Sequence, residues 1–373
     1  MGDAYTPGLT VTASTTVRKT RRLPLPGDVL VAVGDRVRAD DVVARTELPG
    51  KVQILNFANR LGVAPDEIDA TLRVRPGAAI RKGDVLAERR SFFGLFRTAI
   101  ESPIDGTFES VSSVTGQAVL RLPPSPVEVR AYVDGEIVEV IEAEGAVVET
   151  RAALVQGIFG LGGEAHAPLC ALARAPDETL AAERIGRQHA GKIVIGGGYA
   201  PLAALRRAIE VGCAGLVVGG FAYQDIKELL GYDVGVAITG TEQIGTTLIV
   251  TEGFGDIAMA RATFELLCEH DGAGASISGA TQIRAGVIRP EVVIPLPAGA
   301  AADARPVEHR GLEIGAPVRC IRAPHFGKIG EVVGLPVELQ KMPSETMVRV
   351  VDVQLATGER ITIPRANVEV IER

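Results

Sequence analysis

A run of three glycines is the feature of the sequence best suited to contact a ligand. Gly196, Gly197 and Gly198 follow an apolar stretch over residues 192–195 and precede an amphipathic stretch that begins at Pro201. Backbone N–H groups at a helix start attract anions, and glycine lets a phosphate approach the chain closely. The spacing matches neither GxGxxG nor the P-loop. A phosphate or nucleotide site and a tight turn between strand and helix both stay open.

Two glutamates are the next candidates. Glu242 and Glu252 each follow a threonine and stand at or beyond the ends of two expected strands. In an open α/β sheet ligands bind at the carboxyl ends of strands, so these carboxylates could hold a cation or act as acid and base. The alternative, which we favour, is that Thr251 or Asp256 caps the following helix and that the glutamates are solvated.

Two arginines that could bind an anionic ligand lie in one later segment of the chain. Arg284 lies in a polar stretch over residues 276–286, and Arg289 follows it. Guanidinium groups bind carboxylates and phosphates through two parallel hydrogen bonds, which suits a ligand at the edge of a sheet. The stretch fits equally well as a connecting loop whose hydroxyls bond to its own backbone.

Known catalytic patterns are missing from the chain. It contains no Ser nucleophile elbow, no HExxH and no Cys/His dyad. His166 and Cys170 stand four residues apart, but Pro168 intervenes and no second pair follows, so a zinc site is not expected. The sequence therefore predicts no catalytic residues, no metal and no bound cofactor.

The composition is typical of a globular protein in a reducing compartment. Of 373 residues, 46% are hydrophobic and 23% charged, and the formal net charge of −7 argues against a general grip on nucleic acid or an anionic membrane. Four scattered cysteines, with no signal peptide or long apolar run, predict a cytoplasmic location. A short basic arm, which we expect to be exposed and solvated, is formed by Arg18, Lys19, Arg21 and Arg22.

An aromatic cluster stands out because aromatic residues are scarce in this chain. Phe92, Phe93, Leu95 and Phe96 lie between cations in a segment that reads as a hairpin tip. An exposed apolar cluster usually marks a contact with a partner protein or a membrane surface. The alternative is that the tip folds over its own barrel or the next domain, or packs on the related phrase at residues 157–163.

The N-terminal part of the chain contains internal repeats. Residues 30–45 and 72–89 each read as an apolar strand, a glycine turn and a valine-rich strand, and residues 140–153 form a fainter third copy. Hairpin turns are indicated by the pair Asp105-Gly106. We therefore expect a β-rich domain with internal repeats over residues 1–165.

These repeats resemble a known module. Residues 33–37 (VGDRV) and 81–87 (RKGDVLA), followed by 102–107 (SPIDGT), are similar to the barrel-sandwich hybrid of biotinyl and lipoyl carriers. The resemblance covers roughly residues 20–150 and implies a β-rich fold. Some such modules carry a cofactor on a lysine at a hairpin tip, and Lys51 lies near that place. The usual phrase around the lysine is absent, so we expect Lys51 to be an unmodified turn lysine.

Beyond residue 177 the pattern changes to alternating strands and helices. Helices are expected over residues 178–189, 201–211, 223–230 and 257–270, and strands over 192–195, 214–218, 236–239, 247–251 and 292–296. Such alternation predicts a parallel α/β unit. We assign residues 177–296 to a central Rossmann-like α/β domain and the Ala/Pro-rich residues 297–310 to a linker.

The C-terminal residues 311–373 resemble the KOW motif of transcription elongation factors and certain ribosomal proteins. Residues 326–330 (FGKIG) carry most of this resemblance, which implies a small SH3-like β-barrel. In that family the motif often contacts RNA, the ribosome or polymerase. The segment contains eight Lys or Arg and eight Asp or Glu, so its charge favours protein contact or simple packing over nucleic acid.

Together these features predict a multidomain α+β protein with a β-rich barrel-sandwich hybrid, a central α/β domain and a C-terminal SH3-like β-barrel. The leading functional interpretation is a non-catalytic scaffold or adaptor that binds protein partners in a cytoplasmic assembly, with at most peripheral membrane contact. One alternative is a nucleotide- or phosphate-binding enzyme or regulator centred on the three glycines. Another is a transcription- or translation-associated factor that acts through the C-terminal segment.

Overall fold

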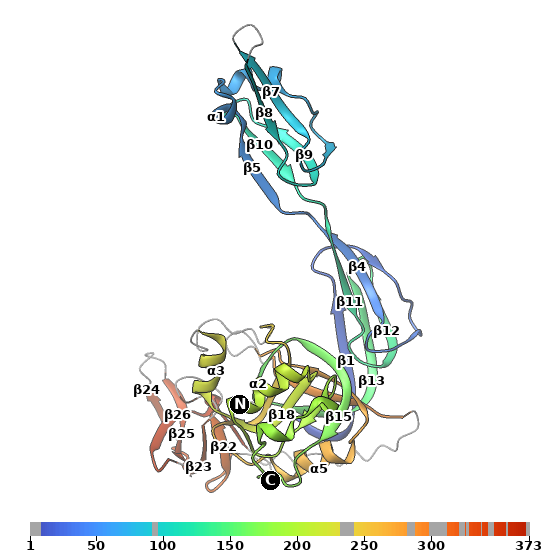
Figure 1. The fold of residues 1–373 in the computed structure, drawn as a ribbon. Coiled ribbons are helices and arrows are strands. Elements are labelled where there is room, and N and C mark those ends of the chain that lie inside the picture. Colours follow the sequence, from blue (N-terminus) through green and yellow to red (C-terminus); the bar gives the residue numbers. More distant parts are fainter. Residues whose placement is uncertain are drawn as a thin grey trace.

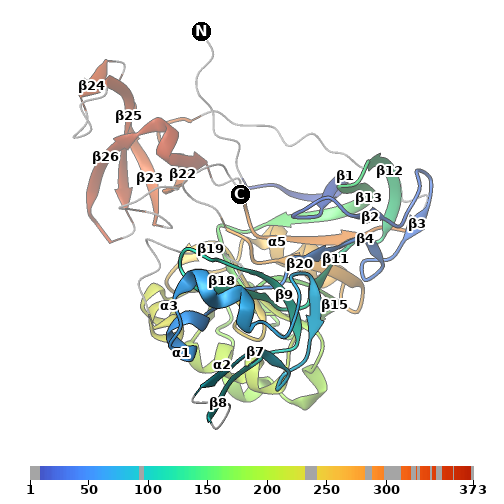
Figure 2. The same ribbon diagram turned by 90° about the horizontal axis from the view of Figure 1, so that it is seen from above.

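The protein consists of a base, a long arm and a C-terminal half-barrel (Figures 1 and 2). Strands account for 48% of the residues and helices for 15%. The computed structural model describes residues 9–91, 96–231, 242–281, 288–297, 312–320, 325, 328–336, 338–341, 347–355 and 357–370. The base carries the half-barrel on one side and the arm on another, and the arm ends far from both (Figure 1).

The base is built on a mixed sheet of 12 strands, three of which, β1, β3 and β12, belong to the arm. Its strands are β13 (Gly145–Gln156), β14 (Phe159–Leu161), β15 (Glu164–Ala171), β16 (Ile193–Ile195), β17 (Tyr199–Ala200), β18 (Gly215–Phe221), β19 (Thr247–Phe254), β20 (Gly274–Ser278) and β21 (Glu291–Pro295). Its helices are α2 (Leu202–Val211), α3 (Tyr223–Leu230) and α5 (Arg261–Glu269), with short 3₁₀ turns η2 (Ala182–Arg184) and η3 (Arg187–His189). The strand order is β14-β19-β18-β16-β15-β20-β21-β13-β12-β3.

The predicted Rossmann-like domain is wrong, and with it the predicted fold class. The strands β15, β16, β18 and β19 do run parallel, but β20, β21 and β13 extend the same sheet in antiparallel fashion. The helix predicted over residues 178–189 is replaced by η2 and η3, and ahead of these turns the N–H of Leu180 donates to the carbonyl of Tyr199 at 2.8 Å. The described residues thus contain no separate α/β layer domain.

The arm consists of two β modules in series (Figure 1). The middle module contains β1 (Val11–Arg22), β2 (Asp28–Val29), β3 (Arg36–Val37), β4 (Val42–Leu48), β11 (Ser125–Arg130) and β12 (Gly135–Ile141), together with the first half of β13. The distal module contains β5 (Val52–Asn56), α1 (Phe57–Leu61), 3₁₀ turn η1 (Pro65–Thr71), β6 (Ala78–Ile80), β7 (Val85–Ser91), β8 (Phe96–Glu101), β9 (Gly106–Val111) and β10 (Gln117–Arg121). The chain thus enters the distal module after β4 and leaves it before β11.

The two modules share one hydrogen-bonding scheme. In the middle module the N–H of Arg38 donates to the Asp41 carboxylate, and in the distal module the N–H of Arg81 donates to the Asp84 carboxylate, both at 2.7 Å. A second aspartate accepts from the next residue in each turn: Asp134 from the N–H of Ala39 at 2.7 Å, and Asp105 from that of Lys82 at 2.9 Å. The repeats over residues 30–45 and 72–89 therefore form equivalent structures in different modules.

Strand pairing shows that one module is inserted into the other. β4 pairs with β11 up to Leu48 opposite Ser125, and β7 pairs with β8 up to Ser91 opposite Phe96. In the distal module only residues 92–95 separate the two strands, whereas in the middle module the whole distal module does. The distal module thus occupies the position of a hairpin tip in the middle module.

The third repeat has a different place from the other two. Residues 140–153 belong to the hairpin of β12 and β13, whose counterpart in the distal module is the hairpin of β9 and β10. Both hairpins carry a bulge at the same point, after Ile137 and around Phe108, respectively. The similarity in sequence reflects a shared hairpin pattern and not a third copy of the unit.

The C-terminal residues form a curved antiparallel sheet of six strands around their own apolar core. Its elements are β22 (Pro317–Cys320), β23 (Ile329–Gly334), β24 (Leu339–Lys341), β25 (Met347–Leu355), β26 (Arg360–Pro364), 3₁₀ turn η4 (Arg365–Asn367) and β27 (Val368–Val370). The hairpin of β22 and β23 carries part of the KOW-like phrase, of which residues 326 and 327 lie outside the described residues.

The nested arrangement leads to a test by deletion. We expect that replacing residues 49–124 by Asn-Gly joins Leu48 to Ser125 through a two-residue hairpin turn, because the two residues already face each other across the ladder. The base and middle module should then unfold cooperatively within ~5 °C of the intact chain, as followed by circular dichroism. A chain that loses cooperative unfolding would show that the middle module needs the distal one.

Candidate functional site

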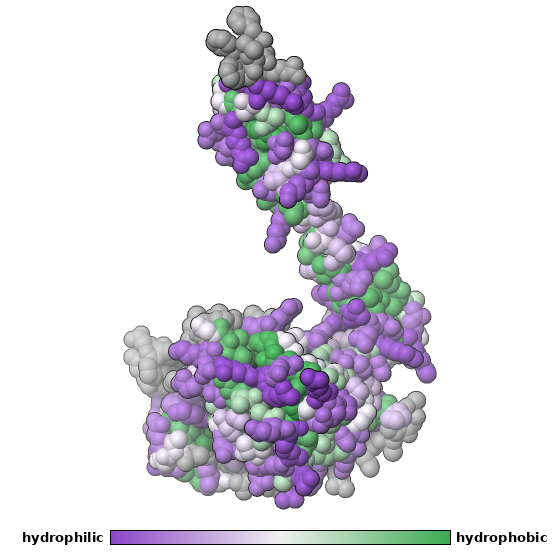
Figure 3. Space-filling model, in the orientation of Figure 1, coloured by the Kyte–Doolittle hydropathy of each residue, from purple (hydrophilic) through white to green (hydrophobic). Residues whose placement is uncertain are grey.

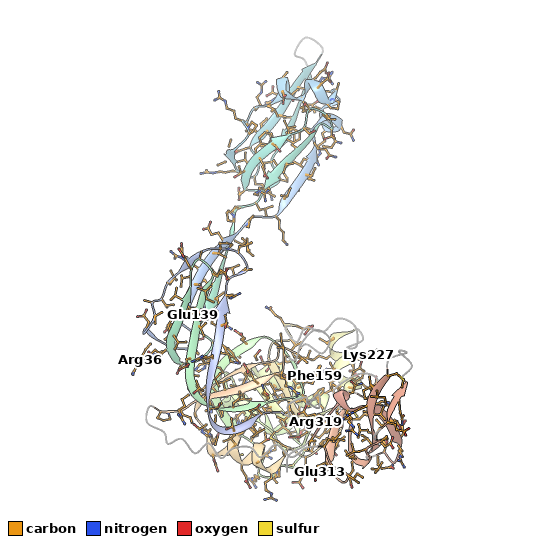
Figure 4. The ribbon with its side chains drawn as sticks, turned by 180° about the vertical axis from the view of Figure 1, so that it is seen from behind. Arg36, Glu139, Phe159, Lys227, Glu313 and Arg319 are labelled. Atoms are coloured by element: carbon orange, nitrogen blue, oxygen red, sulfur yellow. The ribbon has the colours of Figure 1, made fainter. Side chains whose placement is uncertain are left out.

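Charged side chains of the base and the half-barrel meet in a buried contact around Arg319, which is labelled in Figure 4. Glu252 on β19 comes from the base, and Arg319 on β22 and Glu369 on β27 come from the half-barrel. Arg289, just before β21, completes this set, which we call the Arg319 cluster. Each of these residues apart from Arg289 is at most 6% exposed, and the Arg289 side chain is 9% exposed.

Strand alternation explains how Arg319 becomes buried. Val318 and Cys320 point into the core of the half-barrel, so Arg319 between them points to the opposite face of β22. That face is covered by the base. Val368 and Glu369 alternate in the same way on β27. In the sequence Arg319 is only a cation between two apolar neighbours, a pattern typical of a half-exposed strand.

The charges of the Arg319 cluster compensate one another. Arg319 Nη2 lies 2.8 Å from Glu252 Oε2, and Arg319 Nη1 lies 3.9 Å from Glu369 Oε1. Arg289 Nη2 lies 2.8 Å from Glu369 Oε2. Backbone groups satisfy the remaining carboxylate oxygens: Ala260 donates its N–H to Glu252 at 3.0 Å, and Leu9 donates its N–H to Glu369. Two cations and two anions thus form a neutral set.

Burial affects the titration of the central arginine. Desolvation lowers the pKa of Arg319 from its ordinary value, while the charges of Glu252 and Glu369 oppose that change. Because an arginine starts from a pKa above 12, the guanidinium stays charged at any ordinary pH. The paired carboxylates are committed to cations and backbone donors, which makes them poor general bases.

A cavity of about 230 Å³ lies beside the cluster. Its lining includes Thr251, Glu252, Thr263, Arg319 and Glu369. Within the described residues the Nε of Arg319 has no hydrogen-bond partner, so a donor is available there for a water molecule or a small anion. Among the described residues the lining offers no thiol, imidazole or amine nucleophile, and the arrangement suits binding or docking more than catalysis.

Glu252 is the predicted site residue that the structure places in this cluster. The expectation that it is solvated is wrong, because the half-barrel covers the end of β19. Its carboxylate does accept the N–H of Ala260, the residue that caps the start of α5. The sequence placed the helix start at residue 257, with Thr251 or Asp256 as its cap, whereas α5 begins at Arg261. It also missed the partner, Arg319, because Glu252 and Arg319 come from segments far apart in the chain.

The three glycines serve backbone packing. The N–H of Gly196 donates to Val217 at 2.8 Å and that of Gly198 donates to Glu178 at 3.0 Å. A Cβ at Gly197 would lie 2.4 Å from the carbonyl oxygen of Ala175, so neighbouring chain fills the space that a phosphate would need. The start of α2 is also occupied, since Asp225 accepts the N–H of Leu202 at 3.3 Å. This geometry argues against a nucleotide site here.

The remaining predicted residues are placed only in part. Glu242 is half-buried ahead of β19. Arg284, Phe92, Phe93 and Leu95 lie outside the described residues, and of Phe96 only the backbone is described, at the start of β8.

The strand ends beside the aromatic segment lie at the far end of the arm (Figure 1). The related phrase is buried in the base at Phe159, so β7 and β8 are remote from it. Lys51 is exposed where the two modules join, and its carbonyl accepts the N–H of Leu122 at 3.0 Å.

A second charged cluster fixes the arm on the base, and we call it the elbow. Tyr132 of the middle module lies between two cations of β1, with Lys19 Nζ 5.8 Å and Arg21 Cζ 5.3 Å from its ring centroid. Lys19 pairs with Glu291 on β21, and Arg21 forms a two-point ion pair with Glu164 on β15 at 2.6 and 2.8 Å. The Tyr132 hydroxyl donates to Glu291 at 3.2 Å.

The predicted basic arm is exposed at Arg18 and Arg22, as expected, whereas Lys19 and Arg21 are largely covered in the elbow. Its residues lie on β1, where Arg18 pairs with Glu149 and Arg22 with Glu144 in addition to the elbow contacts. Tyr132 itself adopts φ = 73°, a left-handed conformation that bulky residues rarely take. The cation contacts and the hydroxyl bond hold it in this conformation.

Other kinds of site receive no support. Across the described ranges, no three His, Cys, Asp or Glu side chains gather in a way that could hold a metal ion. None of the helices in the same ranges combines the length and apolarity needed to cross a membrane. No protein-family model matches the chain, and no curated protein matches its sequence. Its function therefore has to be inferred from geometry.

Breaking the Arg319 cluster should be costly. Arg319→Met leaves Glu252 and Glu369 buried without their shared cation, and we expect a loss of about 3 to 5 kcal/mol in the free energy of unfolding, measured by urea denaturation. The matched control is Arg360→Met, which removes a cation from an exposed pair with Asp352 on the same half-barrel, and it should cost less than about 1 kcal/mol. Equal losses for both variants would contradict a special role for the cluster.

The elbow should make stability depend on alkaline pH. Burial and the nearby Glu291 and Glu164 raise the pKa of Tyr132 well above its ordinary value. A raised pKa in the folded state means that the stabilisation is complete below about pH 10 and is lost as pH rises further. We expect Tyr132→Phe to be less stable than the wild type at pH 8, and the gap to shrink between pH 10 and 11. A gap that stays constant in urea titrations would contradict this.

Proposed function

We propose that the protein is a non-catalytic scaffold or adaptor whose base and half-barrel hold a two-module arm toward a protein partner. The observation that carries the proposal is the nested arm itself. A module inserted at a hairpin tip places the distal strands β7 and β8 at the end of the molecule opposite to the base (Figure 1). An enzyme does not require such reach, whereas a protein that bridges other molecules does.

The junctions of the arm support the same proposal. The elbow joins the middle module to two base strands through ion pairs and a strained Tyr132. At the next junction the close approach of Gly50 to Leu122 allows little space between the two chain segments: a Cβ on Gly50 would lie 1.8 Å from the Leu122 carbonyl oxygen. An arm held at both junctions presents its end in a defined direction, which suits an adaptor.

The resemblances found in the sequence support the same proposal. The biotinyl/lipoyl-like pattern of the two modules and the KOW-like pattern of the half-barrel both come from families that contact other macromolecules. The exposed Lys51 lies at a module junction and away from the distal tip, so we assign it no cofactor. We propose a cytoplasmic assembly, in keeping with four free cysteines, and protein partners in preference to nucleic acid.

The aromatic segment between β7 and β8 is the contact to test. We expect the triple change Phe92→Ser, Phe93→Ser and Phe96→Ser to reduce the recovery of native partners in a pull-down by at least ~10-fold, because aromatic side chains dominate protein interfaces. The melting temperature should stay unchanged. The control is Val33→Ser, at a 64% exposed apolar side chain of the middle module. Equal recovery with the triple variant would remove this segment from the proposal.

A further inference from the structure

Strand β5 forms an open edge of the distal module. It ends the sheet β5-β10-β9-β6, and no other strand of the described residues pairs with it. The carbonyl of Lys51 accepts from Leu122 at 3.0 Å, and the N–H of Phe57 donates to Gly116 at 2.9 Å. Antiparallel pairing alternates between inward and outward backbone groups. Between these two bonds, Val52 and Ile54 therefore direct both N–H and C=O outward. Asn56 directs only its N–H outward, because its C=O begins the hydrogen bonding of α1.

The side chains on this edge are apolar and uncharged. Val52 is 46% exposed and Ile54 is 59% exposed, high values for β-branched residues. All five residues of β5 are neutral. Figure 3 shows apolar surface on this side of the distal module among charged side chains. An edge of this kind is a template for another strand, unless a protein protects it by charge, proline or a bulge.

The equivalent edge of the middle module is protected by charge. There β1 takes the place of β5, and the N–H of Leu23 donates to Glu144 at 2.7 Å just as that of Phe57 donates to Gly116. The same alternation gives β1 outward backbone groups at Arg18, Thr20 and Arg22. The side chains of the two arginines are 69% and 60% exposed. One module therefore closes its edge with cations, and the other leaves the same positions apolar.

We propose that β5 pairs with β5 of a second copy of this chain, antiparallel and centred on Ile54. In this register Ile54 faces its own counterpart, and the two residues exchange N–H and C=O bonds. Val52 faces Asn56, whose N–H can donate to the Val52 carbonyl. No like charges meet, whereas the same pairing of β1 would place Arg18 opposite Arg22. Charge and register together thus fit a second copy. The distal sheets of the two copies then form one continuous sheet. Because the pairing is antiparallel, the bases of the two copies lie in opposite directions along the strands.

The size of the contact sets the expected strength. Pairs of five-residue strands bury less than the ~1,200 Å² of a stable specific interface, so the dimer is a weak one. This pairing does not involve the aromatic segment between β7 and β8, and it stands or falls independently of the proposed adaptor function.

Sedimentation equilibrium of the full chain tests the pairing over concentrations from ~1 to ~300 µM. The intact chain should shift from monomer to dimer, and Ile54→Lys should raise the dissociation constant at least ~10-fold because it places two cations opposite each other. Thr20→Lys, at the equivalent position of β1, is the matched control and should leave the dissociation constant unchanged. A chain that stays monomeric, or a dimer insensitive to Ile54→Lys, overturns the proposal.

Disulfide trapping provides a second measurement that does not depend on affinity. Residues that face each other in a hydrogen-bonded pair have Cα atoms ~5.5 Å apart, within disulfide range. Ile54→Cys should therefore give a covalent dimer on mild oxidation, and Thr20→Cys should not. A disulfide between Ile54→Cys and a different protein, without self-dimer, would overturn the second copy as occupant in favour of another extended strand.

Discussion

The antiparallel pairing of β1 with β13 joins the arm to the base, and the remaining architecture depends on it. Each strand is 12 residues long, and the ladder runs from Arg22 opposite Gly145 in the middle module to Val11 opposite Val155 in the base. On its other side β13 pairs with β12 in the arm and with β21 in the base. One strand therefore belongs to both parts, and bending the arm here would break ladder hydrogen bonds. Backbone pairing sets the arm direction, and the elbow charges hold it.

Charge connects the parts of this protein at both junctions of the base. The arm is held by Lys19 and Arg21, and the half-barrel by Arg319, each against carboxylates of base strands. Buried ion pairs give little net stability, because desolvation offsets most of their attraction, but they accept few alternative partners. Two parts joined by apolar side chains alone could shift relative to each other, whereas these ion pairs form in only one arrangement of the arm, base and half-barrel. The formal net charge of −7 gives no indication that cations connect the parts of this protein.

Local features of the fold could be predicted from the sequence, and contacts between distant segments could not. The helix predicted over residues 223–230 is confirmed as α3, because its apolar spacing and Gly231 define it locally. The helix predicted over residues 178–189 is wrong, since Leu180 bonds to Tyr199 beyond the glycines and the following residues form only the short 3₁₀ turns η2 and η3. The burial of Arg319 depends on Glu252, which lies in another part of the chain. The insertion of one module into the other could not be predicted for the same reason, because β4 and β11 pair in the structure but are separated in the sequence by the whole distal module.

The insertion of one module into another also fixes an order of assembly. Strands β4 and β11 pair at a lower entropy cost once the chain between them has folded into a compact body, because closing a long flexible loop costs more entropy than closing a short one. The distal module provides that compaction, since its own ladder of β7 and β8 closes over the short segment 92–95. We expect the arm to form from its outer end inward, with the last β-ladder of the arm closing against the base. In a nested arm, each inserted module makes the arm longer and also folds before the module that contains it.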